Sequence, residues 1–322
     1  MKKGNYTIND NFIEILQNKF PKKAQLTEAL VDLLDTERET VYRRLRKEVV
    51  FTADEIIKIA SKWNISLDEL TGTNLERTAL HLKQINYLKP NAKEINFLRS
   101  VIQSINSFKD FPKTEFLNIC NKLPRELLAG YEYLNKFYLF KWKYQYDNAS
   151  KFPNFSQITI SEEQLQITSE YHQAIKQVPN STFIWDSRLF YYLVNDIRYF
   201  YSVYLITKEE KEIIKEELHQ LLDYMLDVAA HGYYPETHKK VNLYISQINI
   251  DTNYNYTFTP EANICFIHAF EKYEIYTFNS ETVANMMTWM QLQKKTAIPI
   301  SKVDEKNRIE FFIQQKILVN SL

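Results

Sequence analysis

The stretch TERETVYRRLR at residues 36–46, followed by TADEIIKIASKWNISLDEL at residues 52–70, decides how the start of this chain is expected to fold. Residues 36–39 fit the capping pattern S/T-x-x-E, in which a hydroxyl and a carboxylate satisfy backbone amides at the start of a helix. The same pattern recurs at residues 52–55 and 66–69. These patterns predict three short helices that begin close to Thr36, Thr52 and Ser66.

Apolar residues at helical spacing predict two further helices upstream and a buried face on the helix after Thr52. The first 72 residues are therefore expected to hold five short helices, with Trp63 buried against Val41, Leu45 and Ile59. The three apolar stripes are Phe12, Ile13, Leu16 and Phe20; Leu26, Leu30, Val31 and Leu34; and Ile56, Ile59, Ala60 and Trp63.

The helix expected after Thr36 separates into an apolar side and a basic side. Val41 and Leu45 share the apolar side, and between residues 38 and 47 five basic residues accompany a single acid. Arg can bind guanine through two hydrogen bonds, and Tyr or Thr can contact phosphates, so such a helix fits the major groove of DNA. The alternative for this helix alone is a solvated charged face. The outward residues are Glu39, Tyr42, Arg43, Arg46 and Lys47, with Arg38 near the N-terminus.

The order of these motifs resembles the lambda-repressor-like (Cro/CI, or XRE-type) family of helix-turn-helix regulators. The resemblance covers about residues 9–72 and lies in L-V-x-x-L at 30–34, T-V-Y-R at 40–43 and the run from 56 to 70. The chain departs from the family pattern where Asp35 replaces the turn glycine, Val31 a small alanine and Tyr42 a common serine. Without that glycine, Asp35 is expected to adopt the left-handed conformation, which Asp tolerates better than most residues.

The resemblance implies a DNA-binding domain over residues 1–74, and Thr27 stands where a DNA-contacting glutamine is frequent in the family. Residues 1–74 carry twelve basic and twelve acidic side chains, so affinity for phosphates must come from local placement and would depend on salt. Pairing of two copies on two half-sites is the usual way for such a module to gain affinity. The expected DNA-binding residues are Thr27, Arg38, Glu39, Thr40, Tyr42, Arg43, Arg46 and Lys47.

Composition indicates a chain that is folded throughout. Of 322 residues, 45% are hydrophobic and 14% aromatic, and only four are glycine, which leaves little room for flexible linkers or Gly-rich phosphate loops. No apolar run is long enough to span a bilayer, and no apolar segment follows the N-terminal lysines as in a secretory signal. We therefore expect a cytoplasmic protein without membrane contact, in which Cys120 and Cys265 are buried free thiols.

The remaining sequence reads as mostly helical, so the expected fold is mainly α. Helices are expected at 75–88, 91–108, 113–122, 125–146, 161–176, 182–206 and 207–230, with a loop and a short strand at 151–160. From residue 239 the apolar period switches to two, which predicts strands at 241–245, 254–258, 264–270 and 273–278. Helices at 280–295 and 301–319, separated by a short strand, complete a small α/β module. The expected domains are thus 1–74, a helical sensor or dimerisation region at 75–238, and the α/β module at 239–322.

Two features of the helical region have alternative interpretations. The aromatic-rich helices around 131–146 and 190–204 could line a pocket for a small effector, although such density is more often core. The residues Ile214, Leu218, Leu221 and Met225 form a short seam that suits a partner helix. Packing within the same subunit ranks slightly ahead of dimerisation for this seam.

Motifs that would indicate catalysis or cofactor binding are missing from the sequence. It contains no phosphate-binding loop, dinucleotide fingerprint, H-E-x-x-H, C-x-x-C or G-x-S-x-G. His231, Glu236 and His238 could be imagined as metal ligands, but their spacing and neighbouring Gly and Pro indicate a turn. His268 in an apolar strand is expected to be a hydrogen-bonded core residue. We expect no catalytic residue, metal or cofactor, although residues 75–322 leave an enzyme open.

The sequence as a whole therefore predicts a homodimeric transcriptional regulator that binds double-stranded DNA at specific sites. Its C-terminal region would sense an effector, either a small molecule or a protein, or hold the dimer. The main alternative is a protein-interaction scaffold, such as an antitoxin or phage-defence component, that uses the helix-turn-helix only to dock. An enzyme that regulates itself through this domain is a weaker alternative.

Overall fold

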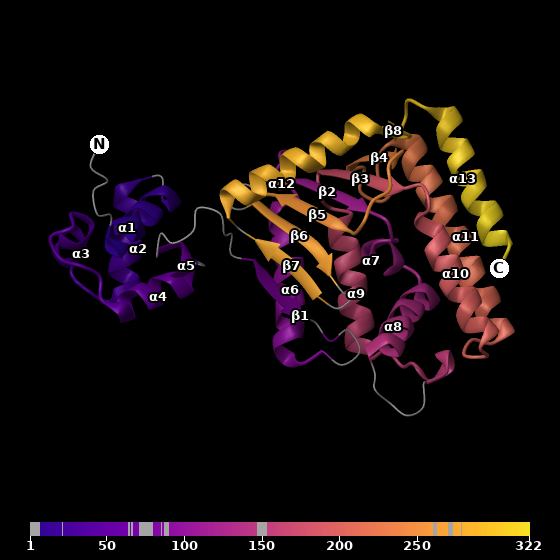
Figure 1. Ribbon diagram of the computed structural model, residues 1–322, viewed down its shortest axis with the longest axis horizontal. Coiled ribbons are helices and arrows are strands. Elements are labelled where there is room, and N and C mark those ends of the chain that lie inside the picture. The colour runs from indigo at the N-terminus through magenta and orange to yellow at the C-terminus, as the bar shows by residue number, and fades with distance from the viewer. Residues whose placement is uncertain are drawn as a thin grey trace. The chain divides into compact units, whose positions relative to one another are not determined.

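The chain divides into two compact units, Met1–Ala79 and Leu80–Leu322 (Figure 1). The computed structural model describes residues 7–20, 22–63, 65, 67–70, 80–84, 86, 90–146, 153–259, 263–269, 273–277 and 279–322. The predicted boundary between 74 and 75 lies outside these residues. The predicted boundary between 238 and 239 falls inside the second unit.

The first unit contains the five short helices that the sequence predicts. Its core brings together the apolar stripes of these helices, with Phe12, Leu30 and Val41 fully buried. The prediction that Trp63 is buried holds only in part, because Trp63 packs against the core cluster that contains Val41 and Ile59 but is not fully buried. Because α4 ends at Trp63, this ring lies at the rim of the core, half-buried, and packs edge-on against Phe20 with centroids 4.8 Å apart. The helices are α1 (Ile8–Lys19), α2 (Lys23–Leu34), α3 (Arg38–Leu45), α4 (Ala53–Trp63) and α5 (Leu67–Leu70).

Helix starts in this unit follow the predicted capping patterns only in part. At Thr52 the pattern is confirmed, because the Glu55 amide donates to the hydroxyl and the Glu55 carboxylate accepts from the Thr52 amide. At Thr36 it is wrong, because α3 has Glu37 as its N-cap and Glu39 is paired with Arg46 instead. The pattern at Ser66 lies outside the described residues.

The turn between α2 and α3 confirms the prediction for Asp35. Its φ of 51° and ψ of 55° place it in the left-handed region, and its amide donates to the Val31 carbonyl at the end of α2. Asp therefore takes the position at which the family pattern has glycine.

The second unit is a mixed α/β structure built on an eight-stranded sheet, so the description "mainly α" is too narrow. The strand order is β1-β7-β6-β5-β2-β3-β4-β8. β2, β3 and β4 are parallel to one another, and all other pairs of neighbours are antiparallel. The strands are β1 (His81–Gln84), β2 (Glu115–Cys120), β3 (Asn180–Asp186), β4 (Lys240–Ser246), β5 (Tyr254–Phe258), β6 (Asn263–Ala269), β7 (Tyr273–Thr277) and β8 (Ala297–Pro299).

Three segments predicted as helix contain strands. Residues 115–120 form β2, residues 180–186 form β3, and residues 81–84 form β1. The rest of the predicted helix at 75–88 lies mostly outside the described residues. β2 and β3 are buried on both faces, so they appear in the sequence as short continuous apolar runs. Periodicity cannot distinguish such a run from a buried helix.

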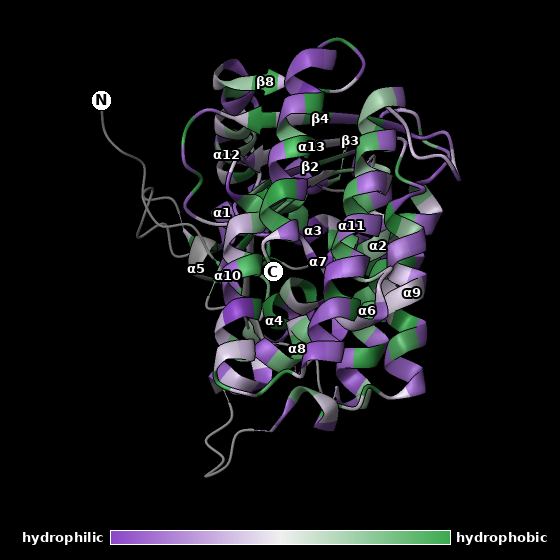
Figure 2. Cartoon of the chain, turned by 90° about the vertical axis from the view of Figure 1, so that its right-hand side faces the viewer, coloured by the Kyte–Doolittle hydropathy of each residue, from purple (hydrophilic) through white to green (hydrophobic). Residues whose placement is uncertain are grey.

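Helices cover both faces of the sheet. On one face, α7, α8, α10, α11 and α13 pack against alternate residues such as Phe116, Phe183 and Leu243, and Figure 2 looks onto α10, α11 and α13 of this layer. On the other face, α12 covers Leu117 and Ile184. The helices are α6 (Ala92–Phe108), α7 (Arg125–Leu128), α8 (Glu132–Tyr146), α9 (Glu162–Ile175), α10 (Leu189–Ser202), α11 (Lys208–His231), α12 (Ser280–Gln293) and α13 (Glu305–Asn320), with short 3-10 turns at Phe155–Gln157 and Lys294–Thr296.

The core of this layer decides the alternatives for the α11 seam and, in part, those for the aromatic-rich helices. Ile214, Leu218, Leu221 and Met225 are fully buried against the same subunit, so the seam of α11 is not a dimer contact. The phenylalanines of α8 and α10 also form core, with Phe140 and Phe200 at a centroid distance of 4.7 Å, whereas Tyr191, Tyr192 and Tyr199 of α10 are exposed. A few residues at the edge of this cluster line a cavity, which is described below.

Candidate DNA interface and a cavity in the C-terminal unit

Helix α3 presents a polar and basic side to solvent, as its sequence predicts. Val41 points into the core and is fully buried, whereas Tyr42 is exposed, and the side chains of Arg43 and Arg46 are each 55% exposed. Helical spacing explains this separation, because residues 42, 43 and 46 lie opposite residues 41 and 45. We call the exposed residues Arg38, Glu39, Tyr42, Arg43, Arg46 and Lys47 the basic side of α3.

Two of the predicted DNA-binding residues do not belong to this side. Thr27 is 1% exposed, and its hydroxyl donates to the Lys23 carbonyl at 2.9 Å within α2. Thr40 is half-buried, and its carbonyl accepts a long hydrogen bond from Arg44. The Thr27 hydroxyl therefore does not form part of the exposed surface around Arg43 and Arg46, whereas Thr40 is partly exposed.

Every basic residue of this side has an acidic neighbour. Arg38 is 2.9 Å from Glu28, Lys47 is 2.7 Å from Asp10, and Arg46 is 2.7 Å from Glu39 and 3.0 Å from Glu48. Arg43 lies 3.7 Å from Glu48. The Lys47 ammonium, together with hydrogen bonds from Thr7, holds the pKa of the Asp10 carboxyl well below its usual value.

These pairs determine how the side can interact with a duplex. Ion pairs between exposed side chains contribute only about 0–1 kcal/mol each, so a phosphate or a guanine edge can replace the acidic partner at little cost. Glu39 and Glu48 also repel phosphates, which disfavours binding to DNA through charge alone. The arrangement therefore suits contacts to particular bases better than indiscriminate binding to polyanions.

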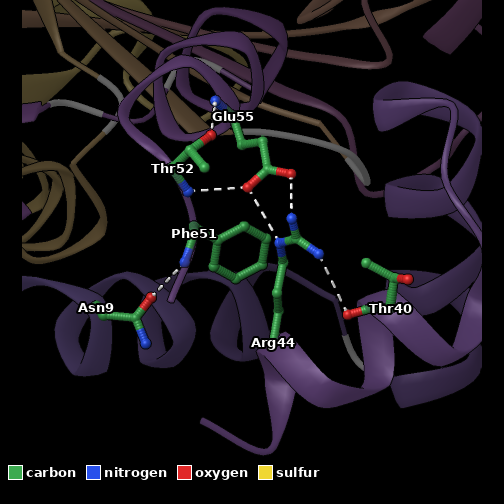
Figure 3. Close-up of polar contacts among 6 residues, drawn as sticks. All are labelled: Asn9, Thr40, Arg44, Phe51, Thr52 and Glu55. Atoms are coloured by element: carbon green, nitrogen blue, oxygen red, sulfur yellow. Dashed lines mark hydrogen bonds and ion pairs between the residues drawn. The ribbon is translucent and has the colours of Figure 1, made fainter. Parts of the chain in front are cut away.

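Arg44 differs from its neighbours because it connects two helices instead of facing solvent. Its guanidinium makes two hydrogen bonds to the Glu55 carboxylate, at 3.0 and 2.6 Å, and lies over the Phe51 ring (Figure 3). The side chains of Arg44 and Glu55 are only 12% and 19% exposed. Glu55 also accepts from the Thr52 amide, so this one carboxylate joins α3 to the start of α4.

The second unit contains a cavity of about 210 Å³ at the carboxyl ends of β2 and β3. In α/β sheets ligands bind outside the carboxyl ends of parallel strands, where the strand order reverses. Here β2 has a parallel neighbour on one side and antiparallel β5 on the other. The cavity walls come from the loop after β2, from α7, α8 and α10, from the loop before β5, and from His268 on β6.

Hydrogen bonds between loops hold the rim of the cavity together. The buried carboxylate of Asp186 accepts from the amides of Arg188 and Ile250, which ties the end of β3 to the loop before β5. The Asn253 side chain accepts from the Asn121 amide, and the Asn121 side chain donates to the Ile250 carbonyl. The rim is therefore built by segments that lie far apart in the sequence.

A row of buried amides leads from the sheet to this cavity. Asn118 donates to Asn255, and the Asn255 amide is 3.2 Å from His268 Nε2. The prediction that His268 is a hydrogen-bonded core residue is confirmed for the hydrogen bond and wrong for the core, because His268 is only partly buried and lines the cavity. The possible pocket at the aromatic-rich helices 131–146 and 190–204 anticipates part of its lining, since Phe137, Tyr138 and Tyr192 contribute to it. Its place at the ends of β2 and β3 was not predicted, because these strands were predicted to be helical.

The described residues also give information on metal ligands, on the two cysteines and on membrane-spanning helices. No group of three or more His, Cys, Asp or Glu is arranged there to hold a metal ion, and His231 contacts the Asp227 carbonyl at the end of α11. Cys120 and Cys265 are buried free thiols, as predicted. In the part of the chain that the structure describes, none of the helices combines the length and apolar character that crossing a membrane requires.

Comparisons with known proteins give no family assignment. The chain matches none of the protein-family models, curated proteins or solved structures with which it was compared.

Proposed function

We propose that this protein is a sequence-specific DNA-binding transcriptional regulator that docks through the basic side of α3. The observation that carries this proposal is the exposure of Tyr42, Arg43 and Arg46 together on a short helix whose other side is anchored in the core. The resemblance of residues 9–72 to lambda-repressor-like regulators supports the same role. Binding to cellular DNA also requires that the protein is located inside the cell.

A single copy of the first unit is expected to bind DNA weakly. It has no net charge over residues 1–74. Its exposed Arg and Lys side chains already form ion pairs with Asp and Glu side chains. Two copies engaging half-sites about one helical turn apart would supply the missing affinity. The proposal therefore includes a homodimer, with the second unit responsible for pairing, for effector binding or for both.

The test begins with a duplex that the full-length protein selects from a randomised pool. We expect Arg43→Ala and Arg46→Ala each to weaken binding to that duplex about 5- to 150-fold at physiological salt, because a base-reading Arg is worth about 1–3 kcal/mol. Fluorescence anisotropy of the labelled duplex measures the loss.

The control is Lys62→Ala, which removes one exposed positive charge from α4. It should change affinity much less than the two Arg substitutions. If all three variants bind the selected duplex as the unmodified chain does, or lose affinity equally, α3 is not the reading helix.

A further inference from the structure

The turn after α3 places Glu48 beside two arginines of the basic side of α3. Arg46 caps the end of the helix, and Lys47 follows in the left-handed region with a φ of 66°. The Lys47 amide donates to the Arg44 carbonyl and the Glu48 amide donates to the Arg43 carbonyl, each at 2.9 Å. These two bonds form a Schellman motif, which reverses the chain at a helix end. The backbone therefore holds Glu48 next to the last turn of α3.

The Glu48 carboxylate contacts both arginines, one with each oxygen. Oε1 lies 3.0 Å from Arg46 Nε, and Oε2 lies 3.7 Å from Arg43 Nε. Glu39 contacts Arg46 alone, at 2.7 Å from Nη2. The side chains of Arg43, Arg46 and Glu48 are about half exposed. A single carboxylate thus occupies the position in which an acceptor group on a duplex would meet both guanidinium groups.

A backbone phosphate and a guanine edge compete differently with this carboxylate. Exposed ion pairs are weak, so either group can displace Glu48 from the two guanidinium groups. The displaced carboxylate stays close to them, because the turn fixes its backbone. Its negative charge then repels a phosphate, whereas a guanine edge presents the uncharged acceptors O6 and N7.

We propose that Glu48 is a specificity-determining residue of the basic side of α3. Its carboxylate keeps backbone phosphates away from Arg43 and Arg46 and leaves these two side chains to guanine edges in the major groove. Glu48 acts on both arginines, whereas Glu39 acts on one. This inference deepens the proposed function and rests on it, because it describes how the same helix distinguishes its own site from other DNA.

The test compares two duplexes of equal length and composition, the selected duplex and a scrambled one. Full-length Glu48→Gln keeps the size of the side chain and removes its charge. Its affinity for the scrambled duplex should rise at least about threefold at physiological salt, because phosphates gain access to both arginines. Its affinity for the selected duplex should rise less, so the ratio of the two affinities falls. Fluorescence anisotropy of the labelled duplexes measures both.

The salt dependence of binding separates this role from a structural one. In Glu48→Gln the affinity for the scrambled duplex should fall more steeply with salt, by the equivalent of about one additional phosphate contact. Loss of structure in α3 would weaken binding to both duplexes instead. Glu48→Asp keeps the charge, so its affinity ratio should stay closer to that of the unmodified chain than to that of Glu48→Gln.

The matched control is Glu28→Gln. It removes the same charge from another exposed ion pair of the basic side, in which Glu28 lies 2.9 Å from Arg38 and both side chains are 62% exposed. Its affinity ratio should remain close to that of the unmodified chain. An equal fall in Glu28→Gln and Glu48→Gln would assign the effect to net charge and overturn the proposal.

The proposal is also overturned if Glu48→Gln leaves the affinity ratio and the salt dependence unchanged. That result would not affect the proposed function, provided that Arg43→Ala and Arg46→Ala still weaken binding to the selected duplex. A chain that selects no duplex would instead lose the proposed function, and with it the specificity that Glu48 is proposed to determine.

Discussion

At the scale of single residues, the environment decides what a charged or polar side chain does. Arg43 and Arg44 are adjacent in the sequence, yet Arg43 is exposed and Arg44 is held between two helices. Thr27 stands at a position that suggested DNA contact, but it is buried and bonded to its own helix. Residue type and spacing indicate which side chains could contact DNA, and burial shows which of these side chains are accessible.

His172 is a residue for which burial has a measurable consequence. Its ring lies between α9 and α7, with Nδ1 2.6 Å from the Glu126 carbonyl, and a Cβ on Gly130 would come within 2.9 Å of Nε2. Burial, together with the nearby charge of Lys176, lowers the pKa of His172 below its ordinary value of 6.5. The His172 ring therefore binds a proton less readily in the folded protein than in the unfolded chain.

We expect stability to be complete above about pH 6.5 and to fall as the pH drops below that value, because the unfolded state then binds more protons. The slope from one such group is at most about 1.4 kcal/mol per pH unit. Urea unfolding at about pH 7.5 and about pH 5.5 measures the loss, which should be smaller in His172→Gln. An equal loss in His172→Gln and in the unmodified chain would assign the acid sensitivity to other groups. His219→Gln, a substitution on α11, serves as the control.

At the scale of helices and strands, local signals predict elements well when one face is buried and the other is solvated. The amphipathic helices α1 to α4 and the alternating strands β4 and β5 fall where their apolar periods predict them. β2 and β3 are buried on both faces, and their periodicity carries no such information. Their identity as strands depends on the neighbours with which they pair.

The link between α3 and α4 gives a prediction at this scale. Arg44→Ala removes two charge-assisted hydrogen bonds from a largely buried pair and leaves Glu55 with only the Thr52 amide among these partners. We expect the first unit to lose about 1.5–3 kcal/mol of stability. Hydrogen exchange of the amides in α1 to α4, followed by mass spectrometry on the full chain, measures the change.

The matched control is Arg46→Ala, whose ion pairs are exposed and worth about 0–1 kcal/mol. Arg44→Ala should therefore lower the stability of the first unit, whereas Arg46→Ala should weaken DNA binding with little effect on stability. Equal protection of the amides in both variants would show that the Arg44–Glu55 pair does not hold α3 in place.

At the scale of the whole molecule, the surface available for pairing differs from the one the sequence suggested. The seam of α11 is buried within its own unit, whereas α13 exposes an apolar row. Ile309, Ile313 and Ile317 lie four residues apart on one side of this helix and are 43%, 51% and 63% exposed. The opposite side of α13 packs into the core through Phe312 and Val319.

If this row contributes to the proposed homodimer, Ile313→Glu should shift the full-length protein from dimer toward monomer, because a carboxylate cannot be buried unpaired in an apolar contact. Light scattering coupled to size exclusion, over a range of concentrations, measures the shift. Gln314→Glu adds the same charge at the neighbouring exposed position and should have a smaller effect. A dimer of equal strength in both variants would exclude α13 from the contact.

The sequence by itself determined the five helices of the first unit, the left-handed turn at Asp35 and the exposed basic side of α3. The helices and the basic side follow from local apolar spacing, with capping confirmed at Thr52 only, and the turn at Asp35 from its position in the helix-turn-helix pattern. Only the tertiary structure decided that β2 and β3 are strands of one eight-stranded sheet, that Arg44 pairs with Glu55, and that Glu126, Leu193 and His268 line one cavity. Each of these depends on contacts between segments distant along the chain, and local periodicity carries no information about such contacts.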